Sequence, residues 1–117
     1  WNFHENNLLV IGMNEKDMAV ASNHLIKSNG GMTVVKNGKV LASMPLQMAG
    51  IISTDSFEQV RKNYSKINST LYDRGCKFKK PHLVPIFLPF LALPEIRILN
   101  TGLVDVKKRQ YIPSINS

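Results

Sequence analysis

The stretch MTVVKNGKVLAS, residues 32–43, decides the fold because it carries the strongest turn signal in the chain. A two-residue type I′ turn requires positive φ at both central positions, and Asn-Gly is the pair that best meets this need. Asn37-Gly38 lies between two runs that favour strands. Both faces of these runs are partly apolar, so we expect cover on both sides for part of their length. The sequence therefore predicts a covered antiparallel hairpin, in which Val35 pairs with Val40 and Val34 with Leu41.

Upstream of the hairpin, the pattern predicts a strand followed by a helix. Residues 8–11, Leu-Leu-Val-Ile, are typical of a short buried strand that ends at Gly12. Asn14 is a good N-cap, and the apolar residues that follow it recur at helical spacing. The run Asn29-Gly30-Gly31 is a strong stop signal, so we expect this helix to span about residues 15–28.

Downstream of the hairpin, the pattern predicts a second amphipathic helix and a last strand. Ser53, Thr54 or Asp55 is the expected cap, and the helix should end near Gly75. Its apolar stripe has spacings of three and four and consists of Phe57, Val60, Tyr64, Ile67 and Leu71. Residues 86–93 are apolar but broken by proline, which predicts a buried, irregular element before a strand at LVDV, residues 103–106. The expected fold is α+β, with two helices on a mixed or mainly antiparallel sheet, in the order strand, helix, hairpin, helix, strand.

Composition narrows the possible classes of protein. The length of 117 residues fits one domain, which we assign to residues 1–117, and 44% hydrophobic residues can form a modest core. No apolar run approaches the roughly 20 residues of a membrane helix, and one cysteine cannot build a disulfide framework, so we expect a cytoplasmic protein without a membrane partner. The formal net charge of +7 suggests an anionic partner, but the densest basic clusters, residues 77–80 and 107–109, lie in no nucleic-acid-binding motif. The chain begins with Trp1 instead of Met, so we expect a piece of a longer protein.

The residues that could carry chemistry are few. His4 and Glu5 are adjacent, and neighbouring side chains of an extended segment point to opposite faces, so they do not readily share a metal. His24 falls beside a helical apolar stripe and is interpreted as a satisfied or exposed histidine, and His82 has no carboxylate nearby in sequence. Cys76 has no sequence-local base. The step from Gly12 to the helix at residue 15 could bind an anion or be a plain turn. The residues alone therefore indicate a domain without a catalytic set of its own.

Several stretches in order resemble the C-terminal domain of bacterial adenine deaminases. The first, LLVIGMNEKDMAVASNHLIKSNGGMTVVKNGKVLASMPLQMAGIIS, residues 8–53, matches a strand ending in Ile-Gly, then Asn-x-x-Asp-Met-Ala, a Gly-Gly break, a hairpin, a Pro-Leu step and an Ala-Gly turn. The second, FLALPEIRILNTGLVDV, residues 90–106, is similar to the ending of that domain. The resemblance runs from about Phe3 to about Pro113.

The resemblance implies a part of a cytoplasmic amidohydrolase of purine salvage, which converts adenine and water to hypoxanthine and ammonia. In that family a barrel domain, absent from this chain, holds manganese or iron. The chain itself would then be incomplete at its N-terminal edge, hold no cofactor and be inactive alone. It would support active-site closure or a subunit contact, with the barrel domain as partner and a homo-oligomer as the expected assembly. Many members carry His-Asp-Ser-His-Asn where this chain has residues 3–7, and only Asn7 matches.

Two other interpretations stay open at this level. The first is a freestanding basic module for an anionic ligand such as a nucleotide or nucleic acid, with nucleic acid the less expected partner. The second is a small enzyme that uses His4 and Glu5 as acid and base, with Asn7 beside them. For self-association, the expected surfaces are residues 86–93 together with Trp1 and Phe3.

Overall fold

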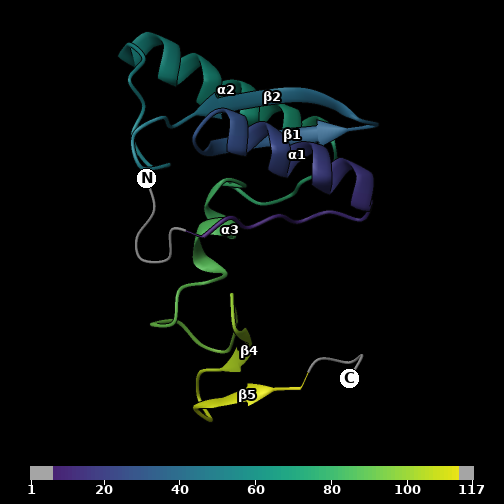
Figure 1. Cartoon of the computed structure of the whole chain (residues 1–117), viewed down its shortest axis with the longest axis vertical. Coiled ribbons are helices and arrows are strands. Elements are labelled where there is room, and N and C mark those ends of the chain that lie inside the picture. Colours follow the sequence, from purple (N-terminus) through teal and green to yellow (C-terminus); the bar gives the residue numbers. More distant parts are fainter. Residues whose placement is uncertain (1–6, 114–117) are drawn as a thin grey trace.

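Two long helices and two separate antiparallel sheets form the part of the chain that the computed structural model describes, residues 7–113 (Figure 1). The elements in chain order are α1 (Glu15–Lys27), β1 (Gly31–Lys36), β2 (Lys39–Pro45), α2 (Phe57–Asp73), α3 (Leu83–Phe87), β3 (Ile96–Leu99), β4 (Gly102–Asp105) and β5 (Gln110–Ile112). The predicted α+β class is confirmed. The residues His4 and Glu5, with Trp1 and Phe3, lie outside the described part of the chain.

The hairpin forms where the sequence predicts it. Asn37 and Gly38 have φ of 52° and 71°, as a type I′ turn requires. Val35 pairs with Val40, as expected, but Val34 pairs with Ala42, because a β-bulge shifts the register between Val34 and Val35. The predicted pair of Val34 with Leu41 is therefore wrong by one residue. The two turn amides donate to the carboxylate of Asp17 in the first turn of α1, over 2.9 and 2.7 Å, which ties the helix to the hairpin.

Helices cover both faces of the β1–β2 sheet. Ala42 and Met44 of β2 are buried with Ile67 of α2, whereas Ser43, which points to the other face, bonds to His24 of α1. The molecule therefore has three layers here, with α1 in front of the sheet and α2 behind it (Figure 1). The buried apolar core consists of Ala42, Met44, Leu46 and Ile67, all on the α2 side, and α1 contributes no buried residue.

Both long helices begin and end close to the predicted positions. The side chain of Asn14 accepts from the amides of Lys16 and Asp17, and Asn29 at φ 57° follows the end of α1. For α2 the cap is Ser56, which accepts from the amide of Gln59, and not one of the three earlier residues that the sequence suggested. Phe57 is 75% exposed, so the predicted apolar stripe in fact starts at Val60.

Residues 8–11 do not form the predicted strand. They run as an extended arm below α1, with Leu8 and Ile11 more than half exposed (Figure 1). A strand needs a hydrogen-bonded neighbour, and among the described residues none pairs with this arm. The apolar pattern is that of a strand, but no described strand lies beside it to pair with.

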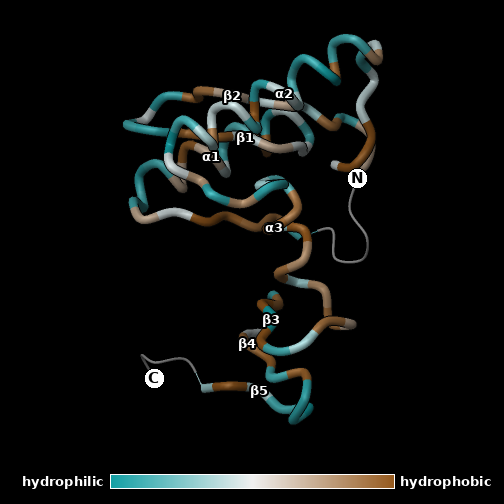
Figure 2. The backbone as a smooth tube through the Cα atoms, turned by 180° about the vertical axis from the view of Figure 1, so that it is seen from behind, coloured by the Kyte–Doolittle hydropathy of each residue, from teal (hydrophilic) through white to brown (hydrophobic). Residues whose placement is uncertain are grey.

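The C-terminal part extends away from the three layers. Residues 86–93 form the end of α3 and a series of turns, and none of them is buried, so the expectation of a buried element there is wrong. The predicted last strand is confirmed as β4, and it lies in a sheet of its own between β3 and β5. The radius of gyration is 15.1 Å, whereas a compact domain of this length has about 13 Å. Figure 2 shows apolar stretches along the arm and the connection to β3. No helix in residues 7–113 is long and apolar enough to cross a membrane.

Candidate functional site

A slot of about 890 Å³ lies beside β1 in the described part of the chain. One wall comes from α1 through Met18, Ala21 and Leu25, and the opposite wall from α2 through Ile67 and Leu71. Residues 7–13 of the arm and residues 81–86 form the side that faces β1. Most of these side chains are apolar, so the slot suits a protein surface better than a polar small molecule.

A second, smaller site lies at the outer side of α2, where His82 is anchored. The imidazole is 6% exposed and lies against the Tyr64 ring, with centroids 4.8 Å apart. The side-chain amide of Asn68 donates to the Tyr64 carbonyl over 3.2 Å, so its oxygen is left to accept from Nδ1 of His82, also at 3.2 Å. Nε2 then accepts from the Tyr64 hydroxyl at 3.0 Å. This network holds the connector after α2 on the helix.

The environment of His82 favours the neutral form of its imidazole. Burial disfavours the charged form, and the nearby ammonium of Lys80 adds repulsion, so both lower the pKa of His82 below 6.5. The pocket beside it, about 380 Å³, is lined by the two tyrosines Tyr64 and Tyr72, by hydroxyl and amide groups of α2, and by Lys79 and Lys80. It is open to solvent. The histidine is saturated by its own neighbours, so its observed role is structural.

The lowered pKa of His82 predicts a pH-dependent stability. The unfolded chain binds a proton at about pH 6.5 and the folded chain only at lower pH, so stability is complete above about 6.5 and falls as the pH drops through the folded pKa. We expect the urea midpoint to be lower at about pH 5.5 than at about pH 7.5, and His82→Gln to reduce this difference. Equal pH dependence in the two proteins would contradict the assignment, since His24 is common to both.

Those residues singled out from the sequence that the structure describes do not converge. Asn7 is exposed at the mouth of the slot, Cys76 is half-buried in its wall, and His24 Nε2 lies 2.8 Å from the Ser43 hydroxyl, as a satisfied histidine should. Asn14 already occupies the first amides of α1, which supports a plain turn after Gly12 instead of an anion site. Within residues 7–113, no group of three His, Cys, Asp or Glu side chains could hold a metal ion.

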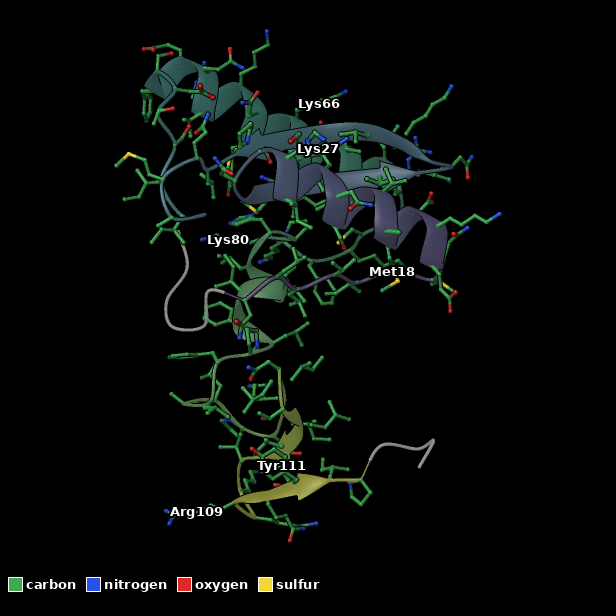
Figure 3. The ribbon with its side chains drawn as sticks, in the orientation of Figure 1. Met18, Lys27, Lys66, Lys80, Arg109 and Tyr111 are labelled. Atoms are coloured by element: carbon green, nitrogen blue, oxygen red, sulfur yellow. The ribbon has the colours of Figure 1, made fainter. Side chains whose placement is uncertain are left out.

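The two basic clusters lie in different parts of the molecule. Figure 3 shows Lys80 near the three-layer part and Arg109 at the far end. In the second cluster Lys107 pairs with Glu95 and Lys108 with Asp105, the latter over 3.6 Å. The two densest clusters therefore do not combine into one cationic face.

Sequence reasoning missed the slot and the His82 network. Tyr64 was assigned only to the apolar stripe, although Asn68 follows it by one helical turn and offers a polar partner on the same face. The pairing with His82 depends on how the connector folds back, which has no local signal. The slot lies beside the edge of β1 with which no described strand pairs, and the residues of β1 do not indicate whether a strand has a neighbour on that edge.

Comparison with known proteins gives consistent matches over the chain. The family model described as adenine deaminase C-terminal domain matches residues 1–110. A protein named adenine deaminase from Cenarchaeum symbiosum is 54% identical over 115 residues, which cover 98% of this chain and 19% of that protein. Adenine deaminases of Clostridium botulinum and Brucella abortus are 42% and 39% identical over 106 residues, which cover 91% of this chain and 18% of each of them. The chain thus spans less than a fifth of the length of these relatives.

Proposed function

The chain belongs to the adenine deaminase C-terminal domain family, and from this premise we propose that it serves as the non-catalytic C-terminal domain of an adenine deaminase. The activity of the whole protein would be the hydrolysis of adenine: water supplies the oxygen of hypoxanthine, and the exocyclic amino group leaves as ammonia. We assign this step to the barrel domain, in the cytoplasm and in purine salvage. The metals, manganese or iron, and the activation of water belong to that domain as well.

The observation that carries the proposal is the imbalance between buried and exposed apolar side chains. In the described part the buried hydrophobic core has four members, whereas fourteen large apolar side chains are exposed, among them Leu8, Ile11 and Phe78. A folded monomer seldom leaves so much apolar surface open unless a partner covers it. The partner that we propose is the barrel domain, with a further contact between subunits of a homo-oligomer. In this arrangement the domain supports closure of the active site or assembly of the subunits.

The freestanding basic module receives less support. Its basic clusters lie apart, and two lysines of the second cluster are already paired with carboxylates. Without a concentrated cationic face, a polyanion would gain few phosphate contacts.

The isolated chain is expected to be inactive, and a chimera is expected to be active. In the chimera this chain replaces the corresponding C-terminal region of the Cenarchaeum symbiosum protein, which is 54% identical. An ammonia-release assay should show no turnover of adenine by the isolated chain, and metal analysis should show no stoichiometric manganese or iron. The chimera should deaminate adenine, and the same protein truncated before this region should lose at least about tenfold in kcat/KM, because a small misplacement of catalytic groups costs up to about 100-fold.

Turnover by the isolated chain would refute the proposal outright. A truncated protein as active and as stable as the chimera would refute the supporting role, because the domain would then be dispensable for both properties.

A further inference from the structure

The wall of the slot formed by β1 consists of the edge of that strand. Residues 29–35 all line the slot, although successive side chains of a strand point to opposite faces. An uninterrupted lining of this kind means that the backbone itself borders the cavity. Among the described residues β1 pairs only with β2, apart from a single bridge between Gly30 and Gly50 at its beginning. From the middle of β1 onward, the edge is therefore open to the slot.

We propose that this open edge of β1 accepts one additional β-strand, and that the strand comes from the preceding part of the full-length adenine deaminase. The inference rests on the proposed function and goes further, because it names the contact: backbone pairing along β1, with apolar side chains of the incoming strand between α1 and α2. An exposed strand edge is a ready template for such pairing.

The register identifies which amides are free to pair. The Leu46 amide donates to the Gly30 carbonyl over 3.2 Å, so Gly30 faces β2. In an antiparallel ladder the direction alternates from residue to residue, so Met32 and Val34 also face β2, and Thr33 faces the slot. On the turn side of the bulge, Lys36 and Lys39 close the two-residue turn, which directs Val35 to the slot. Thr33 and Val35 thus present the unpaired backbone groups.

The walls of the slot fit the thickness of one sheet layer. Leu25 of α1 and Leu71 of α2 flank the cavity from the two helix layers, while the β1 edge continues the plane between them. A strand in that plane would bury the half-exposed side chains of both helices and would pair with β1 at the same time. A helix is about 10 Å wide and would have to separate the two helix layers further.

Two occupants from this chain itself fit less well. The arm and β1 both run towards the hairpin-turn side of Figure 1, with α1 between them in sequence and in front of the sheet. If the arm moved onto the edge, the arm, α1 and β1 would form a left-handed crossover, and about 98% of such crossovers are right-handed. A second copy is also disfavoured, because its own β1 edge is recessed between the same helices. The relatives supply the alternative, since more than four-fifths of their length lies outside this domain.

Hydrogen exchange measured by NMR tests the proposal in the isolated chain and in the chimera described above. In the isolated chain, the amides of Met32 and Val34 should be protected and those of Thr33 and Val35 should exchange quickly. In the chimera, exchange at Thr33 and Val35 should slow by at least about tenfold, because the amides become part of a ladder. Alkylation of Cys76, which lines the slot, reports independently whether the slot is covered.

The proline variant Thr33→Pro blocks pairing at the edge alone. Proline is tolerated on an edge strand where its missing N–H faces outward, so the isolated variant should melt within about 5 °C of the parent chain. In the chimera it should restore fast alkylation of Cys76 and lower the thermal stability. Thr33→Val is the matched control, because it removes the 3.1 Å bond from the Thr33 hydroxyl to the Ala42 carbonyl but keeps the backbone N–H.

The possible outcomes separate the two proposals. Slow Cys76 alkylation in the chimera with fast exchange at Thr33 and Val35 would refute the added strand and leave the docking of the domain intact. Fast alkylation and fast exchange together in the chimera would refute both. Protection of the Thr33 and Val35 amides already in the isolated chain would refute the proposed occupant. Protection that rises with protein concentration would identify a second copy as the occupant. Protection that does not depend on concentration and is shared with residues 8–11 would identify the arm. If Thr33→Pro unfolds the isolated chain, the exchange data on the parent sequence still decide.

Discussion

Gly31→Ala is expected to abolish the folded state, although it adds a single methyl group. Gly31 opens β1 at φ +127°, a backbone conformation that side chains other than that of glycine rarely adopt. An added Cβ would collide with the Met44 carbonyl oxygen and would lie 3.0 Å from the Pro45 Cα. Both atoms belong to the backbone of β2, so relief requires that the strands separate. Backbone strain alone costs about 1–3 kcal/mol, and separating β1 from β2 disrupts the sheet that carries the core.

The loss should therefore exceed about 3 kcal/mol, a large share of the 5–15 kcal/mol that stabilises a typical domain. Circular dichroism in urea would show it as a chain that is unfolded, or nearly so, before denaturant is added. Gly75→Ala is the matched control: Gly75 also has positive φ, +88°, but no atom lies within 4 Å of an added Cβ. It should cost only about 1 kcal/mol. Similar midpoints for the two variants would show that the close approach of β1 to β2 is not what Gly31 serves.

Gly31 also illustrates what the sequence could and could not reveal. The run Asn29-Gly30-Gly31 predicted the end of α1 correctly, because a helix stop depends on local backbone conformation. The same is true of the Asn14 cap and of the Asn37-Gly38 turn. That Gly31 is also the point where two strands come too close for a side chain depends on the register of β1 and β2, which the glycine pair does not encode.

The errors have a common physical origin in non-local contacts. The arm at residues 8–11 has the composition of a strand, but none of residues 7–113 pairs with it. The bulge between Val34 and Val35 shifts the pairing of β1 with β2 by one residue, and no glycine or proline marks its position in the sequence. Phe57 has the right spacing for the α2 stripe, yet it is exposed because the sheet does not extend that far.

The candidate site was even less predictable. The sequence led to Asn7, and to His4 and Glu5 outside the described residues, whereas the structure draws attention to a slot whose walls come from both helices and an edge strand. The slot exists because no described side chains fill the space between these walls. The residue pattern of a single segment cannot indicate such a space. The family resemblance implied a barrel domain as partner, and the proposed contact with that domain would cover the open apolar surface.

Ile67→Ala is expected to produce the second large effect, because the core is small and lies on one side. Ile67 is 2% exposed and is the one fully buried apolar residue that α2 provides. It packs in the cluster with Ala42, Met44 and Leu46 of the sheet side. Truncation of a buried isoleucine to alanine costs about 2–5 kcal/mol, at the upper end where the surroundings cannot collapse into the space. With four residues in the core, no other buried cluster in residues 7–113 can compensate.

Leu25→Ala on α1 is the comparison that makes this prediction specific. Ile67 borders the slot as well, but it is 2% exposed and packs in the core cluster. Leu25 is half-buried and lies outside that cluster, so in the isolated chain its truncation removes less apolar contact. We expect its cost to be below about 1.5 kcal/mol, measured as the shift of the urea midpoint at constant m-value, against at least about 2 kcal/mol for Ile67→Ala. Equal losses would mean that the α1 side is packed as tightly as the α2 side, which would contradict an open slot. In the chimera the Leu25 variant should approach the Ile67 variant in cost, because a filled slot would turn the α1 face into core.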